Sequence, residues 1–451
     1  TAPDVDDLGV TLRFTLKEGE SVSFVFCCLP KSLAGNPFVF AGGVEDMFNE
    51  TLQFWQRWMS KCSYDGRWSE MVYRSALVLK LLTFEPTGAI VAAPTAGLPE
   101  HLGGERNWDY RYTWIRDASF TVYALMRIGF TSEAERFMDW VTQRLEEMDL
   151  TRESPISLMY TIHGTPIPPE QSLKHLSGYR GSKPVRIGNG ASHQLQLDIF
   201  GELMDAVYIF NRHSKPVTYR QWSQLRKLLD WLATNWDKPD ESIWEVRGGR
   251  QNFVFSRVMC WVAFDRATRM SISDSLPGDR AKWMVERDKI YDQVMTRGWS
   301  EERQAFRQHY DTDAIDASNL LLPLFKFISP SDPRMMQTID ATLSSLTADS
   351  LVFRYDPELS PDGLSGNEGT FCVCTFWLVE CLTRAGRLDE ARLIFQRMLS
   401  YANHLGLYGE ELGPYGETLG NFPQAFTHLG LISAAFNLDS ALTQKAIHPL
   451  R

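Results

Sequence analysis

The chain repeats one pattern in two distant places, LMRIGFTSEAE at 125–135 and LTRAGRLDEAR at 382–392. Leu, Arg, Gly, Glu and Ala stand at matching places in both stretches. Each stretch predicts the end of one helix, a Gly that closes it, a Ser or Asp N-cap and the start of a second helix. Helical hairpins are therefore expected to be the repeating element of the fold.

From about residue 45 onward, apolar residues recur with helical spacing, and the series predicts about a dozen helices. The weakest of them lie near 313–328 and 333–346. Such hairpins could form an open solenoid of the tetratricopeptide kind or a closed toroid of helix pairs. The lack of a fixed period of about 34 residues counts against the solenoid. Long, aromatic, Gly-rich connections favour a toroid with a pocket at one end, so we predict a mainly α domain over 41–451.

Residues 9–29, GVTLRFTLKEGESVSFVFCCL, have a different period. Apolar side chains from Val10 to Leu16 alternate with polar ones before a KEGE turn, which predicts a β-hairpin. Two strands alone are only marginally stable in water. We therefore expect residues 1–40 to hold the last strands of a larger sheet plus a linker, and the natural gene product to be longer.

The composition argues against several classes of protein. A net charge of −10 and a pI near 5.5 do not suit a nucleic-acid surface, and the longest apolar runs, such as LLLPLF at 320–325, are too short for a membrane span. Seven cysteines without a CxxC pair and nine scattered histidines predict no metal site. Thiols within apolar runs favour the cytoplasm, whereas the sequon at Asn49 favours secretion.

Four stretches place carboxylates next to rings or glycines at the edges of helical segments. They are RNWDYRYTWIRD (106–117), SIWEVRGG (242–249), FRYDPELSPDGLSGNEGTF (353–371) and GLYGEELGPYGETLGNFPQAF (406–426). Any one of them could simply cap helices and pack at their interfaces. Together they suit a sugar pocket, in which rings stack on the apolar C–H face and charged groups bind the hydroxyls.

Cleavage between sugars needs two carboxyls, one protonated and one ionised. Glu245 follows Trp244, and a ring against a carboxyl raises its pKa, as a general acid requires. Glu410 lies between Gly409 and Glu411 in a loop where one carboxylate could face a water and the other a hydroxyl. Spacing alone does not select these residues from the 56 acidic ones in the chain.

The four stretches resemble the motifs of glycoside hydrolase family 15, which holds glucoamylases, glucodextranases and a branch of trehalases. The resemblance runs from about residue 10 to 440. It implies that Glu245 is the general acid and Glu410 the general base, and that Arg116 and Asp117 clamp O4 and O6 of the terminal glucose. The implied substrate-binding set is Tyr110, Trp114, Arg116, Asp117, Trp244, Arg354, Glu368 and Glu411, with Asn421 in a further pocket-lining loop.

The resemblance also implies an (α/α)6 barrel preceded by an N-terminal β-sandwich, with which this chain could associate. Only the hairpin at 9–29 matches the sandwich, and Gly409 replaces the usual small polar residue before the base. The implied reaction is exo-acting, inverting hydrolysis of α-glucosides by a glucoamylase-type enzyme, with no metal or organic cofactor.

Three alternatives remain open. One is a trehalase of the same family, since all these substrates present the same terminal glucose and the loops at 150–190 and 353–371 decide what lies beyond it. The others are a non-catalytic helical-repeat scaffold and a sugar-binding protein.

Overall fold

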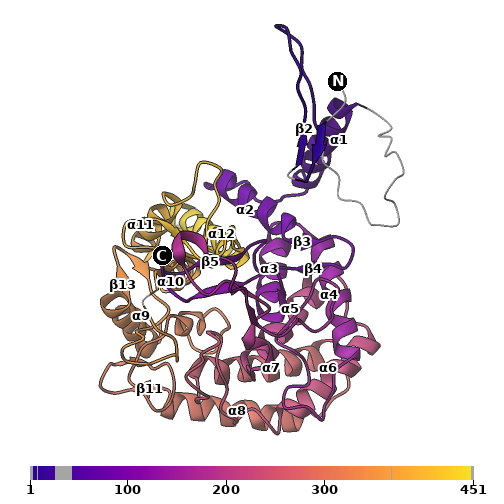
Figure 1. Ribbon diagram of the computed structural model, residues 1–451. Helices are drawn as coiled ribbons and strands as arrows, with labels where there is room; N and C mark the ends of the chain where they lie inside the picture. Colours follow the sequence, from indigo (N-terminus) through magenta and orange to yellow (C-terminus); the bar gives the residue numbers. More distant parts are fainter. Residues whose placement is uncertain (1–3, 8, 26–42, 367, 448–451) are drawn as a thin grey trace. The chain divides into compact units, whose positions relative to one another are not determined.

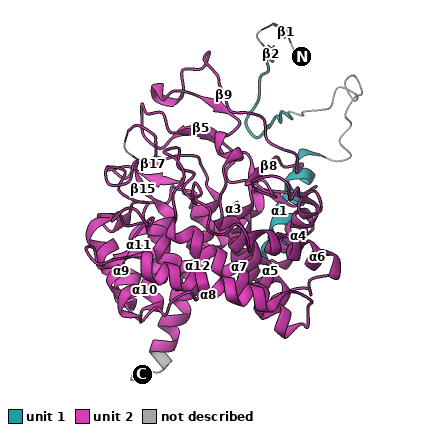
Figure 2. Ribbon diagram, turned by 90° about the horizontal axis from the view of Figure 1, so that it is seen from below, with its two compact units in different colours: residues 1–61 teal, residues 62–451 magenta. Residues whose placement is uncertain are grey.

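The computed structural model describes residues 4–7, 9–25, 43–366 and 368–447. They fall into two compact units, residues 1–61 and 62–451 (Figure 2). Each unit is described by itself below.

Unit 1 contains β1 (Asp4–Asp6), β2 (Gly9–Thr11) and α1 (Val44–Met59), and β1 pairs antiparallel with β2. The predicted turn is present, because the Glu20 N–H donates to the Lys17 carbonyl at 3.0 Å. Phe14 and Phe24 meet across it with ring centroids 5.6 Å apart. The described residues from 12 to 25 nevertheless form no strand, so the paired strands lie earlier than predicted. Exposed apolar side chains with no third strand against them give such a ladder little support. The rest of the predicted hairpin and its linker, residues 26–42, lie outside the described residues.

Unit 2 is helical, and its main helices lie in the region from residue 45 onward where the sequence predicts about a dozen. They are α2 (Ser69–Leu81), α3 (Ile115–Arg127), α4 (Thr131–Glu146), α5 (Asp198–His213), α6 (Tyr219–Leu232), α7 (Val254–Ser273), α8 (Arg280–Arg297), η4 (Ala317–Leu321), α9 (Pro333–Ser345), α10 (Cys372–Arg384), α11 (Leu388–Leu399) and α12 (Ala425–Ile447). The weak segment at 313–328 is the short 3₁₀ helix η4.

The helices alternate between an outer and an inner ring (Figure 1). The inner ring runs α3, α5, α7, η4, α10 and α12, each packed on the next, and α12 closes it against α3. The outer helices α2, α4, α6, α8, α9 and α11 pack on the outside of these. This arrangement of the described residues is an (α/α)6 barrel, and it confirms the predicted toroid.

Burial explains the division between the two rings. All residues of α10 from Cys372 to Thr383 are buried, whereas α8 buries Trp283, Ile290 and Val294. A helix that is apolar all round must be covered on all sides, and one with a single apolar stripe can lie at the surface.

The two echoed stretches form the α3–α4 and α10–α11 connections. Gly129 (φ 101°) and Gly386 (φ 79°) close the first helices in the left-handed conformation, as predicted. The predicted Ser and Asp N-caps are wrong. The second helices begin earlier, at Thr131 and Leu388, without a capping side chain. The glycine turn is so tight that the Ser and Asp fall inside the first helical turn.

Short antiparallel strands connect the helices. They are β3 (Thr83–Phe84) with β4 (Ala89–Ile90), β5 (Ala96–Pro99) with β6 (Asn107–Asp109), β7 (Thr113–Trp114) with β8 (Met159–Tyr160), β9 (Gln171–Ser172) with β10 (Arg186–Ile187), β11 (Trp299–Ser300) with β12 (Ala305–Phe306), β13 (Thr347–Ala348) with β14 (Leu351–Val352), and β15 (Thr370–Phe371) with β16 (Glu411–Leu412) and β17 (Thr418–Leu419). Figure 2 shows β5, β9, β15 and β17 at one end of unit 2 and the C-terminal end of α12 at the other.

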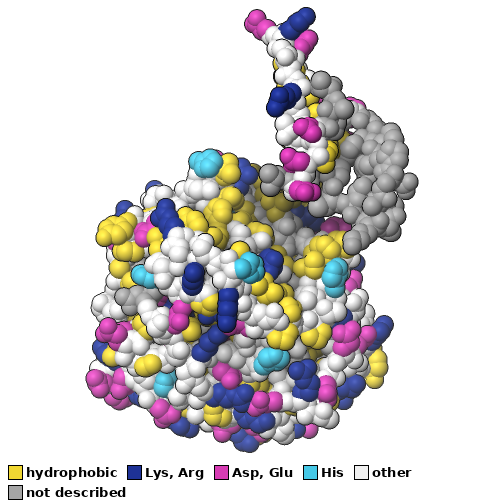
Figure 3. All heavy atoms as spheres, viewed as in Figure 1, with side chains coloured by type: hydrophobic (Ala, Val, Ile, Leu, Met, Phe, Trp, Pro, Cys, Tyr) yellow, Lys and Arg dark blue, Asp and Glu magenta, His cyan; other side chains and the backbone are white. Residues whose placement is uncertain are grey.

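The mixture of side-chain types on the surface and the character of the helices agree with the composition of an ordinary globular protein. Acidic, basic, histidine and apolar side chains are interspersed over the face of unit 2 seen in Figure 3. Within the described part of the chain, no helix has the length and apolar character needed to cross a bilayer.

Candidate active site

A pocket lies where the inner helices α3, α10 and α12 begin, and all four predicted loop stretches contribute to it. Eight of the predicted site residues line it: Tyr110, Trp114, Arg116, Asp117, Trp244, Glu245, Arg354 and Glu410. Glu368 and Glu411 lie behind Arg354 and do not line it.

Glu245 is held by Trp114 and Arg116. The Trp114 indole Nε1 donates to Glu245 Oε1 at 2.6 Å, and Arg116 Nη2 lies 3.4 Å from the same oxygen. Burial raises the pKa of the Glu245 carboxyl, against the opposing effects of Arg116 and of the Trp114 hydrogen bond. The direction of the shift is the predicted one.

The ring that touches Glu245 is not the predicted one. The sequence placed Trp244 against this carboxyl, but the Trp244 indole donates to both oxygens of Asp316, at 3.0 and 2.9 Å. Adjacent side chains of an extended or turning segment point in different directions, so a neighbour in sequence need not be a neighbour in space.

The backbone also presents Glu245 in an uncommon way. Its φ is 59°, in the left-handed region that residues other than Gly rarely adopt. The Glu245 N–H donates to the Ser242 carbonyl at 3.1 Å, and the Gln194 side chain donates to the Glu245 carbonyl at 3.2 Å. These contacts fix a turn that directs the carboxyl into the pocket.

Glu410 is held by Tyr110, from the same stretch that supplies Trp114. The Tyr110 hydroxyl donates to Glu410 Oε1 at 2.7 Å, and the Tyr110 and Trp114 rings meet edge to face at 5.5 Å. One pair of rings from RNWDYRYTWIRD therefore positions both candidate catalytic carboxyls.

Glycines make room for Glu410. A Cβ on Gly420, which has φ 72°, would lie 2.5 Å from Glu410 Oε2. A Cβ on Gly409 would lie 2.4 Å from the Thr418 Cγ2 methyl. The Gly that departs from the family pattern therefore lets β17 approach the segment of Glu410 and Glu411, of which Glu411 lies in β16.

Arg116 and Asp117 form a buried pair at the start of α3. Arg116 Nε donates to Asp117 Oδ1 at 2.7 Å, and Arg116 Nη1 donates to the Ile243 carbonyl at 2.7 Å. The Arg116 guanidinium also faces the Phe426 ring at 5.7 Å. A charged donor and acceptor side by side in a ring-lined pocket can bind two neighbouring hydroxyls of one sugar.

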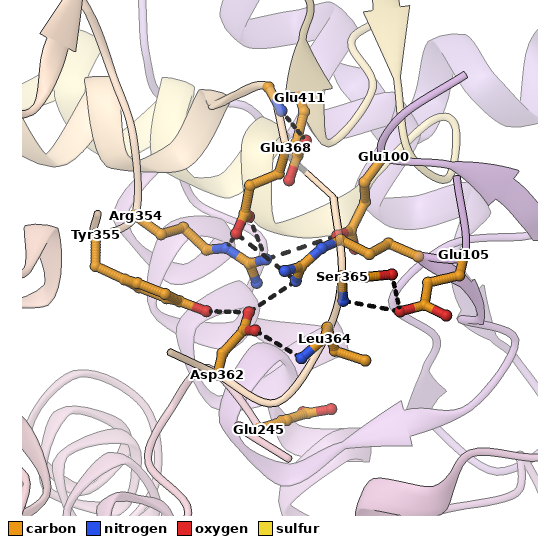
Figure 4. A network of polar contacts seen from close by, with 12 residues as sticks. Glu100, Glu105, Glu245, Arg354, Tyr355, Asp362, Leu364, Ser365, Glu368 and Glu411 are labelled. Atoms are coloured by element: carbon orange, nitrogen blue, oxygen red, sulfur yellow. Dashed lines mark hydrogen bonds and ion pairs between the residues drawn. The ribbon is translucent and has the colours of Figure 1, made fainter. Parts of the chain in front are cut away.

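Arg354 contacts two carboxylates, and a third lies close to them (Figure 4). Its Nε donates to Glu368 Oε2 at 2.7 Å, and its Nη2 lies 3.6 Å from Glu100 Oε2. Glu411 accepts from the Gly369 N–H at 2.8 Å. Burial raises the pKa of the Glu100 carboxyl to about 7, and burial together with the charge of Glu100 holds the pKa of Glu411 well above its usual range.

Glu100, Glu368 and Glu411 are also the group of described residues whose oxygens, within 4.8 Å of one another, could hold a metal ion. Arg354 already supplies a positive charge within this group through its contacts with Glu368 and Glu100. The Arg354 guanidinium therefore neutralises part of the negative charge that a metal ion would otherwise balance.

A second arginine, Arg106, fixes the loop over the pocket. Its Nη1 donates to Asp362 Oδ2 at 2.8 Å, and the Tyr355 hydroxyl donates to the same oxygen at 2.8 Å. Further out, Glu105 accepts from both the N–H and the hydroxyl of Ser365, at 2.8 and 2.7 Å (Figure 4). The stretch at 353–371 is thus tied to the stretch that begins at Arg106.

Trp108 forms the wall that the loop at 150–190 supports. The Arg186 and Arg247 guanidinium groups lie 4.7 and 4.5 Å from its ring centroid. Glu170 pairs with both arginines, at 3.3 and 2.8 Å. Asn421 has a related role behind the pocket, since its side chain donates to the Trp108 carbonyl at 3.0 Å and does not line the cavity.

The sequence analysis missed three buried carboxyls near the pocket. Glu100 lies just ahead of the first loop stretch, outside the four stretches that the sequence singles out. Asp198 and Glu202 lie one turn apart on α5, and burial raises the pKa of Asp198 to about 7 against the charge of Arg116. Two carboxyls four residues apart in the apolar segment LDIFGELM are a signal that could have identified them.

Comparison with known proteins identifies the family of this barrel. The model of Glycosyl hydrolases family 15 matches residues 66–436. A trehalase of Mycolicibacterium smegmatis is 41% identical over 431 residues, covering 94% of this chain and 63% of that protein, so the chain spans less than two thirds of its length. A trehalase of Thermoplasma acidophilum is 38% identical over 454 residues, covering 98% of this chain and 76% of that protein.

The solved structures agree on the fold. A bacterial glucoamylase complexed with acarbose superimposes with a TM-score of 0.69 at 15% identity, covering 90% of this chain and 62% of that one. At that identity the likeness establishes the barrel and leaves the substrate open.

Proposed function

The chain belongs to glycoside hydrolase family 15, and we propose that within this family it hydrolyses trehalose, with Glu245 as general acid and Glu410 as general base. The observation that carries the proposal is the pair of carboxyls held in one pocket by Trp114 and Tyr110. The relatives at 38–41% identity that are named trehalase support this substrate over the glucoamylase-type substrates favoured by the motifs alone.

The proposed reaction uses these groups in turn. Glu245 gives its proton to the glycosidic oxygen as the bond from the anomeric carbon to that oxygen breaks. Glu410 takes a proton from a water that attacks the anomeric carbon from the opposite face. The cycle ends with Glu245 ionised and Glu410 protonated, and exchange with solvent restores both.

The remaining tasks are to bind the sugar and to stabilise the charge that develops on it. Arg116 and Asp117 would bind hydroxyls of the glucose whose bond is cleaved, because both lie in the pocket beside Glu245. The nearby carboxylates would stabilise positive charge that develops on the sugar ring.

The opposite wall favours a second glucose as the leaving group. Glu100, Arg354 and Asn189 line the pocket beside the apolar face of Trp108. A disaccharide of two glucose units presents hydroxyls and one apolar ring face on each side of the cleaved bond. Polar groups on both walls therefore suit a disaccharide of two glucose units, a class that includes trehalose.

The roles of the carboxyls have an electrostatic basis. Burial and the charge of Glu100 hold the pKa of Glu410 well above its usual range, whereas the Tyr110 hydroxyl, Arg354 and the Asn421 backbone amide favour its ionised form. Arg354 and Arg106 favour the ionised form of Glu100, whereas Glu411 accepts from the Gly369 N–H and its pKa is raised well above its usual range. We therefore infer that a proton of this cluster resides on Glu411, that Glu100 keeps part of its charge, and that Glu410 is the base.

Purified protein assayed for glucose release from trehalose, maltose, isomaltose and soluble starch tests the substrate. We expect kcat/KM for trehalose to exceed that for maltose by at least about tenfold, the size of one well-placed hydrogen-bond difference. If maltose is hydrolysed as well as trehalose or better, the glucoamylase-type activity implied by the motifs is favoured instead. Proton NMR of the first turnovers tests the mechanism, because inversion at one carbon of trehalose releases one β- and one α-glucose, and retention releases two α-glucoses.

A further inference from the structure

A second cavity, of about 340 Å³, lies at the other end of the barrel from the pocket. It is lined by the later turns of α3, α5, α7 and α10, by α12 and by residues 324–326. Six cationic side chains line it: Arg127, Arg212, Arg266, Arg269, Lys326 and Arg384. The lining contains three carboxyls, those of Glu202, Asp205 and Glu380. Positive charge is therefore in excess.

Part of this charge is neutralised by ion pairs. Arg266 donates to Asp205 and to Asp265, both at 2.6 Å, and Arg269 donates to Asp265 at 2.6 Å. Arg384 lies 4.0 Å from Glu380.

Three of the cations are not neutralised in this way. Arg127 donates to the Tyr123 hydroxyl at 2.7 Å and to Asn437 at 3.0 Å, and Arg212 donates to the Tyr208 hydroxyl at 2.9 Å. Among the residues that the structure describes, Arg127, Arg212 and Lys326 have no carboxylate within ion-pair distance. These three charges line the cavity without an ion pair among the described residues. Glu380 acts on Arg127 and Asp274 on Arg212 at longer range, and the Arg212 and Lys326 side chains are also open to solvent.

Helix ends account for only some of these cations. Arg127 and Arg212 lie in the last turns of α3 and α5, where a positive side chain stabilises the helix dipole. Lys326 lies outside any helix, and its backbone has φ 64°, which costs free energy for a residue with a Cβ. If only the backbone conformation of this turn mattered, Gly would be more stable at position 326, so the Lys side chain itself is expected to have a role.

The cavity also has the surfaces that hold an organic group. Phe120, Tyr123, Tyr208, Phe325 and Trp377 line it among the cations. Phe120 packs against Phe426 at 5.6 Å, and Phe426 lines the pocket on the other side. The cavity and the pocket are thus separated by one layer of rings.

We propose that this cavity binds a small dianion with an apolar portion, of the phosphate monoester or dicarboxylate class. Arginine and lysine side chains bind such oxyanions through charge-assisted hydrogen bonds, and the rings cover the carbon skeleton. The three cations without carboxylate partners provide the charge that the ligand neutralises. The site is distinct from the sugar pocket and does not depend on the proposed function.

Isothermal titration calorimetry of the full chain tests the proposal, with glucose 6-phosphate, inorganic phosphate, succinate and glucose as probes at constant ionic strength. We expect saturable binding of one equivalent of a dianion and none of glucose. Glucose 6-phosphate binding alone identifies the monoester, and succinate binding alone identifies the dicarboxylate. Inorganic phosphate binding of equal affinity would overturn the proposal that the cavity also recognises an apolar portion.

Matched variants locate the site. Lys326→Gly keeps a backbone that favours positive φ, so it should fold, and Arg212→Gln retains length. Each is expected to weaken binding at least tenfold, whereas Lys227→Gln, which removes a charge from the exposed face of α6, leaves it unchanged. Trehalose hydrolysis should remain in all three. Absence of saturable binding by every dianion, or equal affinity in Arg212→Gln and Lys227→Gln, would overturn the proposal.

Discussion

Glu245 and Glu410 face the same pocket but are held in opposite ways. Glu245 lies in a strained turn beside a cation, and its side chain keeps 19% of its exposure. Glu410 is 1% exposed, adjoins a regular strand and lies among carboxyls. The difference shows that burial raises both pKa values, while the neighbours decide which group can give up a proton.

In the proposed mechanism, Glu245 is the carboxyl that meets the glycosidic oxygen, and Glu410 is the one that must stay ionised within an acidic cluster. The Tyr110 hydroxyl distinguishes Glu410 from Glu411, which accepts instead from the backbone N–H of Gly369. Each prediction below removes one element of this contrast.

The largest effects are expected from the carboxyls themselves. Glu245→Gln and Glu410→Gln should each lower kcat by roughly 10²–10⁴-fold, the usual contribution of a general acid or base, with little change in melting temperature. Steady-state kinetics on trehalose and thermal unfolding measure both. Glu411→Gln is the matched control, and it should cost far less. If Glu411→Gln is the more damaging of the adjacent pair, the base is misassigned.

Asp117→Asn is expected to be the next most damaging. It leaves Arg116 Nε facing an amide in place of a carboxylate and weakens the bond to a sugar hydroxyl. A lost charged hydrogen bond in a buried site costs about 1.5–3 kcal/mol, so kcat/KM should fall roughly 10- to 100-fold. Asp316→Asn, which alters the carboxyl behind Trp244, serves as the comparison for a buried charge outside the sugar contacts. Unchanged kcat/KM in Asp117→Asn would remove this residue from the site.

The helices and their hairpins were predicted from the sequence because their signals are local, whereas the (α/α)6 barrel was implied by the family resemblance. Helical spacing and the glycines at 129 and 386 act within a few residues, so the helices and their pairing could be expected. The hairpin at 9–29 was less well predicted, since a ladder depends on partners that its own residues do not supply.

Motifs in the sequence identified the residues of the site, but they did not predict which side chains contact one another. Both Trp244 and Trp114 were named, but which ring meets Glu245 depends on side-chain directions that spacing does not encode. Glu100 was missed for a similar reason. Its importance arises from Arg354, which lies more than 250 residues later in the chain and 3.6 Å away in the structure.

Tyr110→Phe tests whether the hydroxyl makes Glu410 the base. Removing a donor that favours the ionised carboxyl raises the pKa of Glu410, so the acidic limb of the kcat/KM profile should move to higher pH. We expect kcat to fall by about tenfold, in line with the loss of a charge-assisted hydrogen bond. Tyr355→Phe, whose hydroxyl bonds Asp362, is the matched control and should leave the limb in place. A limb that stays in place in Tyr110→Phe would contradict the assignment.

Glu100→Gln should give the smallest effect, and a shift in the opposite direction. The charge of Glu100 raises the pKa of Glu410, so removing it lets Glu410 ionise at lower pH. The acidic limb should therefore move down by about half a unit to one unit, the scale of a single screened charge. KM for trehalose should rise a few fold, because the same carboxyl lines the proposed leaving-group wall. Glu105→Gln, on the exposed side of the same segment, should change neither quantity. A limb that stays in place or moves to higher pH in Glu100→Gln would mean that the charge of Glu100 does not raise the pKa of Glu410, and would contradict the coupling between the two carboxyls.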